Sequence, residues 1–169
     1  MKKLVNLNGG EIFAIPLFLS DISDLTSFAR DKFETQGGNF AFCRVIADEQ
    51  GGGFLIEVFD LIGTLSQDLN TIINSNRLFR PVAITGLGIY KKRWKKIHIQ
   101  ENYDKEKCSQ YSEIYLVTGT EDNFQLWKGG KDAGFISNKE AEKYEMWTVW
   151  RAGHLEQRII KELKINETT

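Results

Sequence analysis

A chain of 169 residues with 41% hydrophobic and 27% charged residues has the composition of a globular protein and not of a disordered or fibrous one. This length is sufficient for a single domain over residues 1–169 that buries its own core without disulfides. The formal net charge of −1 argues against nucleic-acid binding through the overall field, since proteins that bind in this way are usually strongly basic.

The cysteines and the N-terminal segment indicate a cytoplasmic location. Cys43 lies in an apolar segment, where a free thiol behaves as a small hydrophobe, and Cys108 is the other cysteine, so we expect a reducing compartment. Asn6, Asn8 and Glu11 interrupt the apolar region that a signal peptide would need. No segment approaches the roughly 20 apolar residues of a transmembrane helix, so we expect no membrane association.

Three strands are predicted near the N-terminus, over residues 10–17, 39–46 and 54–60. Each is rich in β-branched and aromatic residues, and Pro16 ends the first. In the second and third strands, apolar residues occupy both the odd and the even positions, which point to opposite faces of the sheet. This predicts that both of their faces are covered. Residues 48–53 end in three consecutive glycines, which is typical of a hairpin turn between the second and third strands.

Four helices are predicted from capping residues and helical spacing. The first follows the capping side chains of residues 20–24 and ends before Gly37. The second ends near Asn74, a short third follows the capping box of Ser137 and Glu140, and the last begins after Gly153. Their apolar faces are Leu25, Phe28, Ala29 and Phe33 in the first, Leu65, Leu69, Ile72 and Ile73 in the second, and Leu155, Ile159, Ile160 and Leu163 in the last.

Further strands are predicted over residues 81–86 and 93–100, and a late hairpin over 113–118 and 123–128. The fold class we expect is therefore α+β. Its sheet is strongly curved, mainly antiparallel and partly barrel-like, with about six or seven strands, and three or four helices pack on it.

Glu57 interrupts an otherwise apolar strand, which leaves two alternatives. The side chain either faces solvent, which is the commoner situation for a glutamate, or pairs inside the protein with a cation such as Arg44.

Residues 91–96, Lys-Lys-Arg-Trp-Lys-Lys, hold five cations and one aromatic ring. In an extended segment the cations divide between two faces, and the register of Ile97 and Ile99 predicts a bulge or a sheet end nearby. Three interpretations remain open: an edge strand whose lysines discourage aggregation, a surface for an acidic protein partner, or a site for single-stranded nucleic acid.

Recognisable catalytic patterns are missing from the sequence. His98 and His154 are not at metal-ligand spacing from each other or from a cysteine. The glycines of residues 51–53 precede a strand and not the helix that a phosphate loop requires. We therefore predict no catalytic residue, no metal site and no cofactor.

Three groups of segments occur in order along most of the chain. They are residues 10–17 with 40–45, residues 57–60 with 81–82 and 93–97, and residues 149–150 with 154–159. Together they resemble the bacterial Immunity protein 26 family of polymorphic toxin systems. The chain departs from the family pattern at Cys43, where a glycine is commoner, and at residues 20–38, where a short turn is expected.

The resemblance implies a non-enzymatic protein that binds and neutralises a cognate toxin domain. Because clustered charge steers association, we expect Arg93, Trp94, Lys95 and Lys96 to contact an acidic region of the toxin. A general protein-interaction module is the main alternative, followed by a nucleic-acid-binding module or a small enzyme with an unrecognised site. The sequence does not indicate the oligomeric state.

Overall fold

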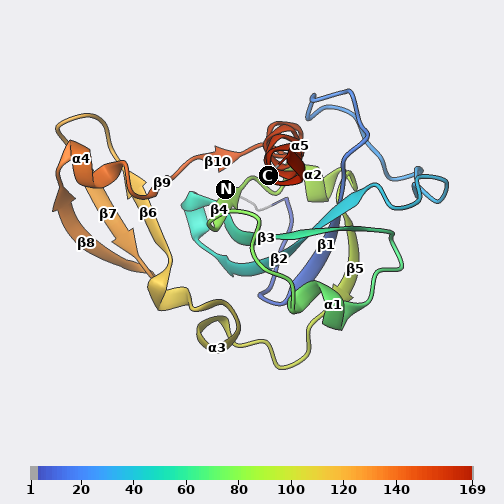
Figure 1. The fold of residues 1–169 in the computed structure, drawn as a ribbon, viewed down its shortest axis with the longest axis horizontal. Helices are drawn as coiled ribbons and strands as arrows, with labels where there is room; N and C mark the ends of the chain where they lie inside the picture. Colours follow the sequence, from blue (N-terminus) through green and yellow to red (C-terminus); the bar gives the residue numbers. More distant parts are fainter. Residues whose placement is uncertain (1–3, 169) are drawn as a thin grey trace.

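The computed structural model describes the fold of residues 4–168 and the side chains of residues 4–164, and shows two β-sheets and five α-helices in this part of the chain (Figure 1). The strands are β1 (Glu11–Pro16), β2 (Phe40–Asp48), β3 (Phe54–Gly63), β4 (Val82–Ile84), β5 (Lys95–Ile99), β6 (Tyr115–Thr118), β7 (Phe124–Lys128), β8 (Lys131–Ile136), β9 (Glu145–Met146) and β10 (Val149–Trp150). The helices are α1 (Leu69–Ile73), α2 (Leu87–Tyr90), α3 (Lys105–Ser109), α4 (Asn138–Ala141) and α5 (Ala152–Thr168), with 3-10 turns η1 (Gln50–Gly52) and η2 (Tyr111–Glu113).

The larger sheet has the strand order β10-β4-β3-β2-β1-β5, and the smaller has the order β8-β7-β6-β9. All neighbouring strands are antiparallel except the β10–β4 and β6–β9 pairs. The predicted α+β class is confirmed, but the strands form two sheets where we expected one. Neither sheet closes into a barrel, so the partly barrel-like character is not confirmed.

The three N-terminal strands, the hairpin turn and the covering of both sheet faces are confirmed. On one face Cys43 and Val45 of β2 pack against Leu155, Ile159 and Leu163, which lie four residues apart along α5. Burying each of these three side chains contributes about 1.5–3 kcal/mol. The last predicted helix is therefore confirmed as a main cover of the six-stranded sheet.

The other face of the six-stranded sheet is covered by α1 and by residues 17–39, which we call the 17–39 loop. Phe40, Phe42 and Phe59 of the sheet pack there against Ile72 of α1 and Phe33 of the loop. α1 begins at Leu69, so the second predicted helix is shorter than expected. A third apolar cluster joins the two sheets and contains Ile46, Leu55, Tyr111, Ile114 and Leu116.

The helix predicted after residues 20–24 is wrong, since residues 17–39 form turns and no helix. Asp21 accepts a hydrogen bond from the backbone N–H of Ser23, and Asp31 accepts one from that of Phe33. Such short side chains compete with helical hydrogen bonds. Phe33 has a φ of 55° and is buried on the sheet, whereas Leu25 is 85% exposed, so the apolar residues do not share one face.

The capping box before α4 is confirmed in part, because Ser137 Oγ accepts a hydrogen bond from the N–H of Glu140 at 3.0 Å. The strand over residues 81–86 and the late hairpin are also confirmed, as β4 and as β6 with β7. Short elements that the sequence did not predict are α2, α3, β8, β9 and β10.

The two cysteines should differ in reactivity. Burial raises the pKa of the Cys43 thiol far above its ordinary value, whereas Cys108 is partly exposed. Iodoacetamide should therefore alkylate Cys108 in the folded protein and Cys43 only after unfolding. Mass spectrometry of peptides from native and denatured samples measures both sites, and equal labelling in the native state would contradict the placement of Cys43.

Candidate functional site

The structure places Arg93 and Trp94 in the interior, although we expected both on a partner-binding surface. Arg93 donates from Nε and Nη2 to the two carboxylate oxygens of Glu156 on α5, each at 2.7 Å, and Trp94 Nε1 donates to the same carboxylate at 3.0 Å. Burial raises the pKa of Glu156, and these three donors oppose that rise. Two of the four predicted contact residues thus hold α5 in place.

Lys95 and Lys96 are the predicted contact residues that reach the surface. Lys95 donates from Nζ to the carbonyl of Phe28 at 2.8 Å and lies 4.8 Å from the centre of the Phe33 ring. Burial lowers its pKa. The Lys96 side chain is 49% exposed and pairs with Glu11 at 3.0 Å. Lys96 is therefore more accessible to a partner than Lys95.

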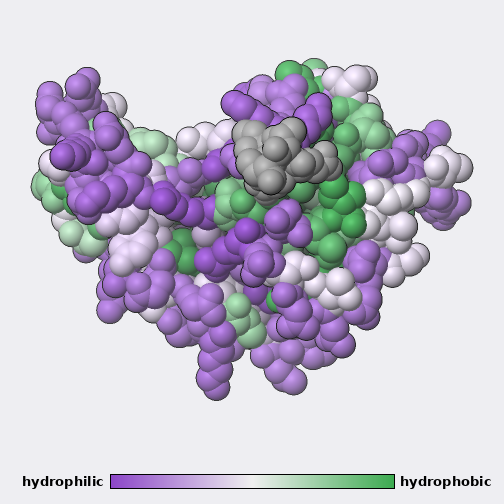
Figure 2. All heavy atoms as spheres, in the orientation of Figure 1, coloured by the Kyte–Doolittle hydropathy of each residue, from purple (hydrophilic) through white to green (hydrophobic). Residues whose placement is uncertain are grey.

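β5 forms one edge of the six-stranded sheet, as the edge-strand interpretation requires. Its register with β1 shifts between Ile12, opposite His98, and Phe13, opposite Lys96, which confirms the predicted bulge. Next to it is a hollow of about 400 Å³, the β5 recess, lined by charged residues and by an apolar wall. Its lining includes Glu11, Lys92, Trp94, Lys95 and Lys96, with Val5, Leu7, Phe13 and Ile89 as the apolar wall. Figure 2 shows hydrophobic surface gathered over α2 and β1, in this region.

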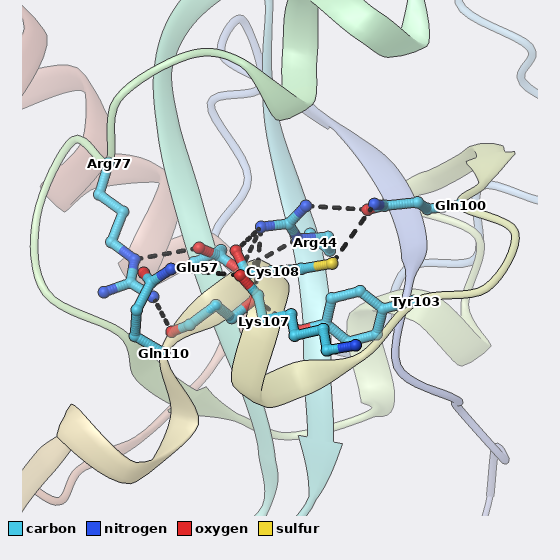
Figure 3. Close-up of polar contacts among 9 residues, drawn as sticks. Arg44, Glu57, Arg77, Gln100, Tyr103, Lys107, Cys108 and Gln110 are labelled. Atoms are coloured by element: carbon cyan, nitrogen blue, oxygen red, sulfur yellow. Dashed lines mark hydrogen bonds and ion pairs between the residues drawn. The ribbon is translucent and has the colours of Figure 1, made fainter.

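Glu57 is buried, so the favoured prediction that its side chain faces solvent is wrong. Arg44 Nε donates to Glu57 Oε2 and Arg77 Nε donates to Glu57 Oε1, both at 3.0 Å (Figure 3). Ser109 Oγ also donates to Oε2. The pair with Arg44 was one of the two alternatives, whereas Arg77 and Ser109 were missed because they lie 20 and 52 residues further along the chain.

This buried network joins the two central strands to the segment that contains α3. Arg44 donates to the side chain of Gln100 at 2.8 Å and to the carbonyl of Cys108 at 3.0 Å (Figure 3). Tyr103 shares a hydrogen bond with Ser109, and burial raises the pKa of Tyr103 to about 12. Tyr103 therefore stays protonated at neutral pH, and the network acts as a structural brace.

Arg77 carries the network to the surface. Its Nη2 donates to the carbonyl of Ser109 at 2.6 Å, and 31% of its side chain is exposed. Beside it is a hollow of about 390 Å³, the inter-sheet groove, between the loop before β4 and the edge of the smaller sheet. The groove is lined by Arg77, Phe79, Arg80, Pro81, Glu113, Ile114, Tyr115, Lys143 and Tyr144.

No sequence signal pointed to this groove, because its residues come from three separate segments. Two of its walls meet where the rings of Tyr115 and Tyr144 stack with their centres 5.0 Å apart and an angle of 26° between them. Aromatic and arginine side chains at a hollow are typical of protein-binding hot spots.

The described residues hold no group of three or more His, Cys, Asp and Glu side chains that could bind a metal ion. His98 Nε2 lies 2.6 Å from the carbonyl oxygen of Gln67, and His154 is exposed. Within residues 4–168, no helix has the length and apolar character needed to cross a membrane.

The described residues thus form an α+β scaffold with a buried ionic brace and two charged hollows at its surface. The family model described as Immunity protein 26 matches residues 8–123, which is more than half of the chain. The chain therefore belongs to the Immunity protein 26 family, and the resemblance in the sequence is confirmed. Searches of curated proteins and of solved structures return no match.

The Glu57 brace should dominate local stability. Replacing Glu57 with Ala leaves the buried Arg44 without its carboxylate, and we expect a loss of about 3–5 kcal/mol in the free energy of unfolding. Denaturant unfolding measures this loss. Asp60→Ala removes an exposed carboxylate from the same strand and should change stability by less than about 0.5 kcal/mol. Equal effects from the two variants would contradict the brace.

Proposed function

We propose that this protein is a non-enzymatic immunity protein that binds the toxic domain of a bacterial polymorphic toxin and neutralises it in the cytoplasm. Membership of the Immunity protein 26 family is the observation that carries this proposal. A toxin that must be silenced before it acts requires tight binding, roughly nanomolar, which corresponds to about 12 kcal/mol. The main alternative is a general protein-interaction module.

The structure is compatible with such a role because its charged groups divide into braces and surface groups. Arg44, Glu57, Arg93 and Glu156 are buried in ion pairs and hold the scaffold. Charged side chains at the surface can instead discriminate between related partners, since a mismatched charge opposes association.

We further propose that the β5 recess contributes to the toxin interface, with Lys95 and Lys96 as part of it. Lys96 and Lys92 are exposed, and the buried pair of Arg93 and Glu156 fixes the backbone that carries them. Arg93 and Trp94 then act as support for the surface. Cations at such a rim attract an acidic partner and increase the association rate at low salt.

The test is titration calorimetry of this protein with the C-terminal domain of the large secreted protein encoded beside it. We expect tight stoichiometric binding, and co-expression should relieve the toxicity of that domain. If both proteins are folded and no binding is detected, the immunity function is contradicted.

The β5 recess has its own variants. Lys92→Glu combined with Lys96→Gln should weaken binding about tenfold or more at low salt, mainly by slowing association, and less at high salt. Lys139→Glu combined with Lys131→Gln, the same pair of charge changes at exposed positions of α4 and β8, is the matched control. Surface plasmon resonance separates the two rates, and an unchanged association rate would rule out this recess as the interface.

A further inference from the structure

We propose that the inter-sheet groove receives an acidic segment of the partner protein, with Arg77 and Arg80 binding its carboxylate groups. This inference rests on the proposed immunity function and adds a second contact surface to it. It concerns different residues from the β5 recess, at the other side of the six-stranded sheet, because the groove borders β4 and the smaller sheet while β5 is the opposite edge.

The charge of the groove favours an anionic occupant. Its lining contains three cationic residues, Arg77, Arg80 and Lys143, and one carboxylate, Glu113, in a chain whose net charge is −1. Glu113 lies 3.6 Å from Lys128, which offsets its charge in part. Arg80 is exposed and has no ion-pair partner among the described residues. Its guanidinium is therefore available to a carboxylate from another molecule.

Arg77 is held in place before any partner arrives. Its Nε and Nη2 donate inward to Glu57 and to the carbonyl of Ser109, and Nη1 meets no acceptor among the described residues. Because Glu57 also pairs with Arg44, the buried cluster has two cations for one carboxylate. Arg77 lines the groove and carries part of this excess positive charge to it. A fixed guanidinium also loses little conformational entropy on binding.

Lys143 contributes less to this site than the two arginines. It pairs with Glu140 on its own turn at 2.9 Å, and that bond raises the pKa of Lys143. A carboxylate entering the groove must therefore compete with Glu140 for Lys143, but meets no such competitor at Arg80.

The walls of the groove favour a protein segment over a small inorganic anion. Phe79 and the stacked rings of Tyr115 and Tyr144 provide apolar surface beside the arginines. Arg158 of α5 lies 4.2 Å from the centre of the Phe79 ring and fixes that wall of the groove. A small ion uses the charges alone, whereas a peptide covers the aromatic surface as well and excludes water from the charge pairs.

The groove also combines two parts of the chain. Arg77, Arg80 and Tyr115 lie within the residues that match the family model, and Lys143 and Tyr144 lie beyond residue 123. The groove therefore depends on residues from both sides of this boundary.

The decisive variant is Arg80→Glu, since Arg80 is exposed and outside the buried brace. With the toxin domain encoded beside this chain, we expect at least about a tenfold loss of affinity by calorimetry. Lys131→Glu, a charge reversal of the same size at an exposed position of β8 that lines neither hollow, is the matched control and should change affinity by less than about twofold. Circular dichroism confirms that both variants are folded.

A second measurement tests the groove without the toxin. A synthetic peptide of alternating Glu and Tyr is titrated into the isotope-labelled protein and followed by NMR. The backbone amides of Phe79, Arg80, Tyr115 and Tyr144 should shift, and Arg80→Glu should abolish these shifts. Phosphate at the same concentration should give smaller shifts, confined to the arginines.

The outcomes separate the two proposals. If the toxin binds the wild-type protein and the Arg80→Glu and Lys131→Glu variants equally well, the groove proposal is overturned and the immunity function stands. If the toxin does not bind but the peptide shifts the groove residues, the immunity function fails and the acidic preference of the groove holds. If neither the toxin nor the peptide binds, both proposals are overturned. If phosphate causes shifts as large as those caused by the peptide, the groove is a simple anion site and the groove proposal is overturned.

Discussion

The carboxylate of Glu57 on β3 links β2, the loop before β4 and α3, so the relative placement of these segments depends on how that buried charge is satisfied. A charge removed from water is costly unless opposite charges and donors surround it. Here Arg44, Arg77 and Ser109 meet that requirement, and they come from β2, the loop before β4 and the end of α3. The network therefore fixes the relative placement of segments that apolar packing alone would hold less specifically.

Arg93 and Glu156 repeat this solution on the other face of the sheet, where they join the segment before β5 to α5. In both places charged residues form the interior frame, and other charged residues at the surface remain to meet a partner. The proposed immunity function uses this division, because a rigid frame presents surface charges without reordering them on binding.

The strands could be predicted because alternating and continuous apolar runs between glycines and Pro16 are local signals. The helix expected before Gly37 failed because Asp21 and Asp31 bind nearby backbone N–H groups, which spacing does not reveal. The basic segment was misjudged for another reason. Its Arg93 is neutralised by Glu156, 63 residues later, and only the fold brings the two together. The inter-sheet groove has no local pattern at all.

The late position of α5 in the chain affects how the protein folds during synthesis. Leu155, Ile159 and Leu163 complete the cluster against β2, and Glu156 supplies the counter-ion of Arg93. During synthesis the earlier strands emerge from the ribosome first, with an exposed apolar face and an unpaired guanidinium. The sheet can therefore reach its final packing only after residue 163 has left the ribosome, and until then the exposed apolar face is prone to aggregation.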